Sequence, residues 1–371
     1  MIRKNIILLL FTSLLLVNCG GSDDESQSDD IAPIAYDRAK MLVHWADKII
    51  LPAHSSFKQT LIDLDNSTKS FVAVPNQSNL DDIRSKWLIS YKSWQHIEMF
   101  DIGKSEEIYF KSKMNSYPAF KTRIENNIML GNTNFDDVSN YSSQGFPALD
   151  YMLFGIASDD TNILNKYTGG SDYSNYLTSL VNKMLNSTNS VINDWNDYRT
   201  SFISSTDNTA SSSVNKLIND FIFYYEKGLR ANKVGIPAGV FSGNPLKENV
   251  EAFYNKEVSK DLLLNALDAT IKFYDGTSYD GLSSGPSLKS YLTHLNSSKD
   301  GSTLAALIAS KLETAKSQIN TLSNNFINQI ESDNNKMLVT YDAIQSVVVL
   351  FKVDMLQAFS INVDYTDADG D

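Results

Sequence analysis

Apolar residues recur along most of this chain at spacings of three and four, which places them on one face of an α-helix. The first run comprises Ala39, Leu42, Val43, Ala46, Ile49 and Ile50. Pro52 lacks a backbone N–H and should kink or restart this helix, which continues along a similar face to Leu64. No stretch alternates apolar and polar residues convincingly over five or more positions. The pattern therefore predicts an all-α fold.

The same periodicity predicts further helices that should pack their apolar stripes together as bundles. One begins near Asn79, and the others span 119–128, 172–198, 214–232, 261–274, 288–295, 303–330 and 336–359. The segment 204–213 is rich in Ser, Thr, Asp and Asn, which favours a linker. We therefore predict an N-terminal bundle at 34–203 and a C-terminal bundle at 214–371. The alternative is a long loop within one continuous helical body.

The N-terminus has the pattern of a lipoprotein signal peptide, predicted at 1–18. Arg3 and Lys4 precede an apolar run at 6–17, which is too short to span a bilayer comfortably. Leu-Val-Asn-Cys at 16–19 is similar to a lipobox, although Asn18 stands where a small residue is usual. We predict lipidation of Cys19, which would anchor the protein to a membrane. An ordinary secretory signal with an incidental cysteine is the alternative.

Residues 19–33 are predicted to form a flexible acidic tether. Acids directly after a lipidated cysteine resemble a surface-export signal of Bacteroidetes lipoproteins, and a plain spacer is the alternative. We expect a location at the outer membrane, either periplasmic or surface-exposed. The net charge of −12 argues against nucleic acid or an anionic bilayer face as partner. Because Cys19 is the only cysteine, the sequence excludes an intramolecular disulfide and a cysteine-based zinc site.

Two acids stand out against the apolar pattern. Trp87, Tyr91, Trp94 and Glu98 step by three or four and share one helix face, so Glu98 should end a stripe that faces the interior. In the stretch 144–155, Pro147 suits the first residue of a helix, and Asp150 would then lie in its first turn. A helix start with a favourable acid explains Asp150 without any function.

Three segments resemble the imelysin family of bacterial envelope proteins, which are classed as metallopeptidases and linked to iron uptake. Its Gly-x-His-x-x-Glu motif corresponds to Gly145-Phe-Pro-Ala-Leu-Asp150, in which Pro147 replaces the histidine and aspartate replaces glutamate. The segment 87–103 is similar to the family's paired tryptophans followed by glutamate and glycine. The segment 234–254 is similar to its Gly-Ile-Pro-Ala-Gly loop and the following helix. The resemblance implies the branch that lacks the motif histidine.

Three functions follow from this resemblance and from the residues. A non-proteolytic binding protein would take up iron, an iron chelate or another metal, in contact with uptake machinery. A metallopeptidase of the imelysin type is disfavoured, because Pro147 cannot bind a metal and the four histidines lie apart in sequence. A structural or interaction lipoprotein without a small ligand is the third. If a metal is bound, Glu98 and Asp150 are the predicted ligands, and they would suit iron or another hard cation.

The pattern Gly-apolar-Pro-Ala occurs at both Gly145 and Gly235, so a degenerate duplication of the two halves is an open alternative. We predict that these two loops meet between the bundles and bring charged groups together there. Arg230 could neutralise one of the buried acids, because an unpaired buried charge is costly. The predicted ligand-binding residues are Glu98, Gly145, Pro147, Asp150, Glu226, Arg230, Ser242 and Glu251.

Overall fold

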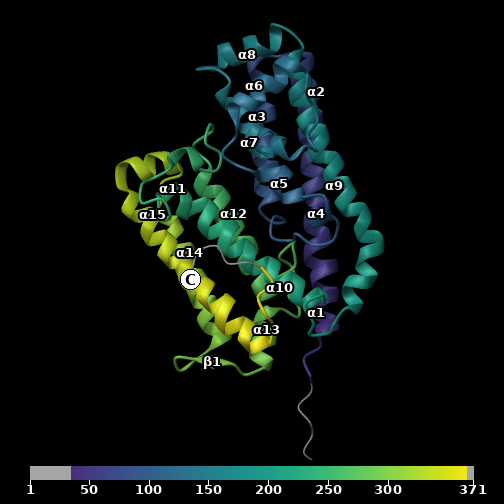
Figure 1. Cartoon of the computed structure of the whole chain (residues 1–371), viewed down its shortest axis with the longest axis vertical. Coiled ribbons are helices and arrows are strands. Elements are labelled where there is room, and N and C mark those ends of the chain that lie inside the picture. The colour runs from purple at the N-terminus through teal and green to yellow at the C-terminus, as the bar shows by residue number, and fades with distance from the viewer. Residues whose placement is uncertain (1–34, 366–371) are drawn as a thin grey trace, which may run out of the picture. The chain divides into compact units, whose positions relative to one another are not determined.

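The fold is described from a computed structural model that describes residues 35–365 (Figure 1). Residues from Tyr36 onward form one compact unit. The regular secondary structure of the described part is helical apart from one very short hairpin, so the predicted all-α class is confirmed. The predicted signal peptide, Cys19 and the tether lie outside the described residues. No helix between residues 35 and 365 combines the length and apolar character needed to cross a membrane.

The first half of the described chain contains three long helices, α2, α3 and α9, together with shorter elements, of which η1 and η3 are π-helical and η2 is a 3₁₀ helix. In order these are α1 Arg38–His44, η1 Trp45–Ile50, α2 Leu51–Ala73, α3 Gln77–Trp94, α4 Lys104–Glu107, α5 Phe110–Asn115, α6 Lys121–Leu130, η2 Val138–Ser143, α7 Gly145–Asp150, η3 Tyr151–Gly155, α8 Asp160–Thr168 and α9 Asp172–Ser204.

The second half contains three long helices and the hairpin. In order these elements are α10 Ser213–Phe223, η4 Tyr224–Gly235, α11 Ile236–Ala238, η5 Lys247–Asn249, α12 Ser259–Asp275, α13 Leu288–His294, β1 Ser298–Lys299, β2 Ser302–Thr303, α14 Leu304–Asn320, α15 Phe326–Val349, η6 Leu350–Met355 and α16 Leu356–Phe359. The strands β1 and β2 are antiparallel, with Lys299 opposite Ser302.

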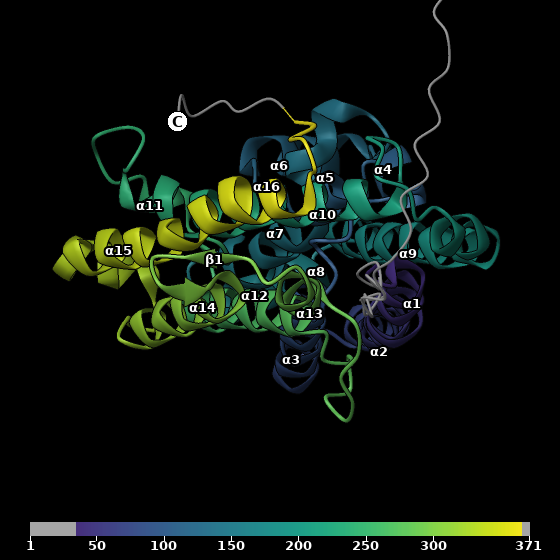
Figure 2. The ribbon, with the colours of Figure 1, turned by 90° about the horizontal axis from the view of Figure 1, so that it is seen from below.

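Helix α2 packs against both α3 and α9, which the colours of Figure 1 show as a purple-to-teal group. In the second half, α15 packs against α14 and η4, and Figure 2 shows α14 and α15 side by side. The two groups touch where α3 meets α12 and where α1 meets α10. Their buried apolar side chains form one continuous core. This arrangement brings the end of α3 close to elements of the second half.

Two chain segments test the predicted helix boundaries. Pro52 lies in the first turn of α2, directly after the π-helical turn η1, which agrees with the expected restart of the helix at the proline. A π turn re-routes the backbone hydrogen bonds at a place where proline cannot donate one. The prediction of one helix over 303–330 was wrong. Helix α14 ends at Asn320, and α15 starts at Phe326, where Asn325 is the N-cap residue.

The predicted linker 204–213 begins on the last residue of α9 and ends on the first residue of α10. Between them the chain forms turns and bends. Arg38 reaches this loop and donates to the carbonyl of Thr206 at 3.4 Å. The division into two bundles at this loop stays a prediction.

Candidate functional site

Glu98 ends the aromatic stripe of α3, as the helical spacing indicates. Trp87, Tyr91 and Trp94 are all buried, and Tyr91 stacks on Phe146 from α7 with ring centroids 4.4 Å apart. The turn after α3 is held by the Glu98 backbone N–H, which donates to the carbonyl of Trp94 at 3.0 Å. Glu98 is therefore fixed in the interior, where only 7% of its surface is exposed.

Glu98 belongs to a buried cluster, which we call the Glu98 cluster, with Asn115, Lys233, Glu251 and Gln95. The Asn115 amide donates to Glu98 Oε1 at 3.0 Å and to Glu251 Oε1 at 2.9 Å. Lys233 Nζ donates to both oxygens of Glu251, at 2.8 and 2.7 Å. Gln95 also donates to Glu251 Oε1, at 3.3 Å. The cluster thus joins the turn after α3, the end of α5, η4 and the segment after η5.

The charges of this cluster do not cancel. Glu98, Glu251 and Lys233 are 7%, 3% and 2% exposed, so none of them is substantially hydrated. Lys233 lies 2.7 Å from Glu251 but 3.5 Å from Glu98 Oε2. Two carboxylates against one ammonium leave one negative charge in a desolvated place, which is unfavourable without a further proton or cation.

A pocket of about 250 Å³ opens beside Glu98. Its lining residues are Glu98, Lys111, Ser112, Asn115, Ser116, Tyr117, Phe223, Tyr224, Lys227, Gly228 and Asn232. The hydroxyl of Tyr224 is buried, and Glu98 acts on it as a hydrogen-bond partner. Burial raises the pKa of both Tyr117 and Tyr224 well above the usual value, and the nearby carboxylates of Glu98 and Glu251 act in the same direction. Both hydroxyls are therefore protonated donors.

Asp150 has a different environment from Glu98. Its Oδ2 accepts the backbone N–H of Tyr254 at 2.8 Å, and its Oδ1 accepts that of Asn255 at 2.9 Å. Burial raises the pKa of Asp150 to about 7, while these two hydrogen bonds lower it. Asp150 is the last residue of α7, so the predicted position in a first helical turn was wrong. It is stabilised by tertiary hydrogen bonds.

Gly145 and Pro147 shape the start of α7. Gly145 has a φ of +70°, and a Cβ atom there would collide with the carbonyl oxygen of Met114 in α5. Only glycine meets both conditions. Pro147 is buried in the same turn. The two residues therefore let α7 pack closely on α5, which supplies Asn115 to the Glu98 cluster.

Glu226 and Arg230 lie in a second buried cluster, which we call the Glu226 cluster. Lys227 and Lys352 contact the Glu226 carboxylate at 3.1 and 3.3 Å, and Arg230 lies 3.6 Å from it. Tyr365 donates its hydroxyl to Glu226 at 3.1 Å. The predicted pairing of Arg230 with a carboxylate thus occurs with Glu226 one turn away, while Lys233 is the cation that contacts Glu98 and Glu251.

The remaining predicted residues are not all at one place. Glu251 joins Glu98, but Ser242 is exposed, and its hydroxyl donates to the carbonyl of Asn244 at 2.6 Å. The predicted metal ligands Glu98 and Asp150 have separate sets of partners. Within residues 35–365 there is no group of three or more His, Cys, Asp or Glu side chains that could hold a metal ion.

Comparison with known proteins shows which family has this architecture. The family model of Imelysin, designated Peptidase M75, matches residues 50–352. This chain belongs to the imelysin family. An imelysin-like protein from Psychrobacter arcticum 273-4 superposes with a TM-score of 0.68 at 16% identity, covering 90% of this chain and 100% of its own. A protein from Parabacteroides distasonis ATCC 8503, provisionally named an iron-regulated protein A precursor, superposes with a TM-score of 0.71 at 19% identity. The match covers 89% of this chain and 97% of that protein. No curated protein matches the chain.

The imelysin resemblance identified some members of the Glu98 cluster and missed others. Glu98 and Glu251 lie in segments that resemble the family, whereas Asn115 and Gln95 were not predicted. Lys233 directly precedes the segment 234–254, and an apolar helix face that includes a lysine was the available signal. Asn115 is the last residue of the short helix α5, in a region that the sequence pattern left irregular and where periodicity gives no signal.

Proposed function

We propose that this imelysin-family protein is a cell-envelope lipoprotein that binds a ligand without proteolysis and acts in the uptake of iron or another metal. Its relative from Parabacteroides distasonis is provisionally named for iron regulation. The proposed anchor is a lipid on Cys19, which lies outside the described residues. The proposed location is the outer membrane, on either its periplasmic or its outer side, next to the uptake machinery.

The absence of proteolysis is supported by the chemistry of the Gly145–Asp150 turn. A metallopeptidase requires metal ligands with an open coordination position, together with a base that activates water. Pro147 offers no ligand atom, and each oxygen of Asp150 accepts a backbone N–H from the segment after η5. This observation carries the proposal, because the turn uses its acid to connect two segments of the fold.

The proposed ligand is iron, an iron chelate or another hard cation, for which carboxylate oxygens are suitable partners. Glu98 lines a pocket and belongs to a cluster in which two carboxylates share one ammonium group. Asp150 would contribute to binding indirectly, because its hydrogen bonds to Tyr254 and Asn255 hold the segment that carries Glu251.

The test uses the mature protein purified to homogeneity without added metal. Metal content is measured by mass spectrometry, and ferric citrate and divalent cations are titrated by calorimetry. Casein hydrolysis is followed with and without a chelator. We expect bound or titratable metal and no hydrolysis. Chelator-sensitive cleavage that returns when metal is restored would overturn the non-proteolytic role, and a protein that binds none of these ions would overturn the role in metal uptake.

The anchor is tested separately with Cys19→Ser in cells. The variant should move from the membrane fraction to the soluble fraction. Retention of the variant in the membrane fraction would show that the lipoprotein interpretation is wrong. Protease shaving of intact cells then distinguishes the outer face of the membrane from the periplasmic face.

A further inference from the structure

Glu98 and Tyr224 line the same pocket, and Glu98 acts on the Tyr224 hydroxyl as a hydrogen-bond acceptor. Glu98 is 7% exposed and Tyr224 is 1% exposed. Buried polar atoms in folded proteins nearly always have a partner, because an unpaired one costs about 1–3 kcal/mol. A carboxylate is an acceptor, and a hydroxyl can both donate and accept. The Tyr224 hydroxyl can therefore accept one more hydrogen bond and the Glu98 carboxylate can accept others, which a donor bound in the pocket would supply.

The charge of the Glu98 cluster specifies part of that molecule. Two carboxylates surround one ammonium, and the better pair is that of Lys233 with Glu251, at 2.7 Å against 3.5 Å for Glu98. A protonated amine at Glu98 Oε2 would complete two carboxylate–ammonium pairs. Such charge-assisted hydrogen bonds are roughly twice as strong as neutral ones.

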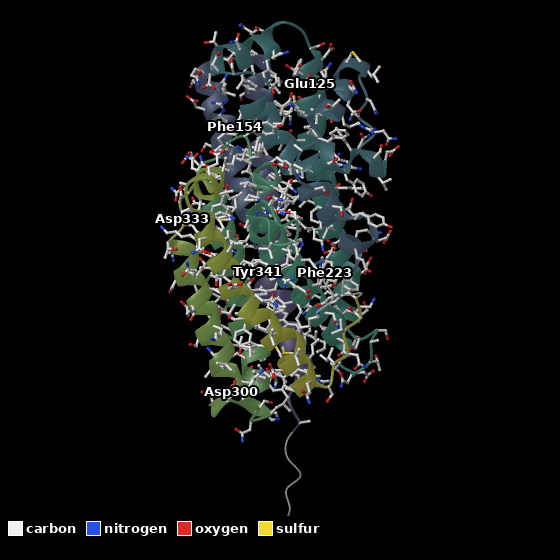
Figure 3. All side chains as sticks on the ribbon, turned by 60° about the vertical axis from the view of Figure 1, so that its left-hand side comes forward. Glu125, Phe154, Phe223, Asp300, Asp333 and Tyr341 are labelled. Carbon is white, nitrogen blue, oxygen red and sulfur yellow. The ribbon has the colours of Figure 1, made fainter. Side chains whose placement is uncertain are left out.

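The walls and rim of the pocket specify the remainder. Tyr117, Phe223 and Tyr224 provide aromatic surface for an apolar or cationic group, and Phe223 is labelled in Figure 3. Lys111 and Lys227 also line the pocket, 3.2 Å from Asp101 and 3.1 Å from Glu226 respectively. Two lysines there favour a ligand that is negatively charged at its other end. The volume of about 250 Å³ lies below the range usual for drug-sized ligands.

We propose that this pocket binds a small zwitterion of amino-acid size, with its ammonium group at Glu98 and Tyr224 and its carboxylate toward Lys111 and Lys227. The aromatic walls contact its apolar side chain. This inference deepens the proposed function and rests on it only in that the protein is a binding protein. The pocket volume of about 250 Å³ suits a ligand of this size, and its two charged ends distinguish a zwitterion from a simple amine.

The test compares three probes of nearly equal shape by calorimetry with the folded mature protein. L-leucine carries both charges, isoamylamine lacks the carboxylate, and 4-methylpentanoate lacks the ammonium group. We expect leucine to bind most tightly, isoamylamine about tenfold or more weakly, and 4-methylpentanoate not at all. If no heat is measured for leucine up to about 10 mM, the proposal is wrong. If the acid binds as well as leucine does, the proposed role of Glu98 is wrong.

Two variants assign the two ends of the ligand. Glu98→Gln keeps the side-chain length and should weaken both leucine and isoamylamine about tenfold or more. Lys111→Met should weaken leucine several-fold and leave isoamylamine unchanged. Glu125→Gln is the matched control, because Glu125 accepts the hydroxyls of Tyr151 and Tyr173 away from the pocket, and Figure 3 shows it well apart from Phe223. Circular dichroism confirms that each variant is folded. Equal affinity of Glu98→Gln and wild type for leucine would overturn the assignment.

The outcomes separate this inference from the proposed function. Metal binding without leucine binding would overturn the zwitterion site and leave metal uptake standing. Leucine binding without metal binding would support the zwitterion site and overturn the role in metal uptake. Competition between ferric citrate and leucine, measured in one titration, would place both ligands at the Glu98 pocket.

Discussion

The Glu98 cluster and the Glu226 cluster are both buried, and both take a cation from η4, yet they balance charge in opposite ways. Glu226 has three cations within 3.6 Å and a tyrosine hydroxyl at 3.1 Å. In the Glu98 cluster, two carboxylates compete for Lys233. The pocket includes Glu98 itself, while from the Glu226 cluster it includes only Lys227.

The difference indicates which acid serves the structure and which is available for a ligand. A fully buried carboxylate needs its partners to remain ionised, and Glu226 has them within the protein. Glu98 shares Lys233 with Glu251 and lines an open pocket. We infer that the Glu226 cluster stabilises the packing of η4 against η6, and that the Glu98 cluster is arranged for binding.

The largest expected effect is on the Glu226 cluster. Glu226→Ala leaves Arg230, itself 1% exposed, beside Lys227 and Lys352 without their shared carboxylate. Removing one partner of a buried ion pair typically costs about 3–5 kcal/mol, and we expect this loss in the free energy of unfolding by urea denaturation. Lys227→Gln is the control and should cost less than about 1 kcal/mol, since Lys227 is partly exposed. A change of under about 1 kcal/mol for Glu226→Ala would contradict the structural role.

Asp150→Ala should have the next largest effect on stability. It removes the acceptor of two backbone N–H groups, those of Tyr254 and Asn255. Leaving these groups without a partner should lower the free energy of unfolding by about 2–4 kcal/mol. Hydrogen exchange should show faster exchange at these two amides in particular. If their protection is unchanged while stability falls, the contribution of Asp150 lies elsewhere in the fold.

The contrast between the clusters also shows what sequence can predict. The four-residue separation of Glu226 and Arg230 places both on one helix face, so their contact is local and predictable. The aromatic stripe likewise predicted that Glu98 faces inward. Asn115 contacts Glu251 across 136 positions, and no periodicity in either segment encodes that contact. The long-range part of the site therefore required the fold.

Asp150 illustrates the opposite error. An acid near a predicted helix start suggested a local interaction with the helix terminus. In the fold its carboxylate serves the backbone of a segment about a hundred residues later, at separations of 104 and 105. The family resemblance identified the residue, but neither the motif nor the helical pattern specified its hydrogen-bond partners. Similarly, the start of α15 at Phe326 is capped by Asn325, which apolar spacing does not reveal.

A third acid, Asp220 of α10, extends the comparison, because the stability of the fold should depend on pH through its carboxyl group. Burial, together with the nearby Asp101, Asp364 and Glu106, raises its pKa to about 8, although Lys111 opposes this shift. A carboxyl whose pKa is higher in the folded protein than in the unfolded chain adds stability below about pH 4, and this stability is lost as the pH rises to about 8.

Asp220→Asn should remove that loss. Because Asp220 is partly exposed, we expect the variant to gain about 2 kcal/mol over wild type between pH 5 and pH 8. Urea midpoints at both pH values measure the gain. Parallel pH dependence of the two proteins would show that Asp220 does not titrate differently on folding.

The smallest effect on stability is expected at Glu98, where the comparison is most easily broken. Glu98→Gln retains an oxygen for the Asn115 amide, and it leaves Lys233 with its closer partner, Glu251. The variant also removes the excess negative charge of the Glu98 cluster, so the lost ion pair at 3.5 Å is offset. We expect the free energy of unfolding without ligand to stay within about 1 kcal/mol of wild type, or to rise. A loss as large as that of Glu226→Ala would show that both clusters are structural and that Glu98 does not serve a ligand.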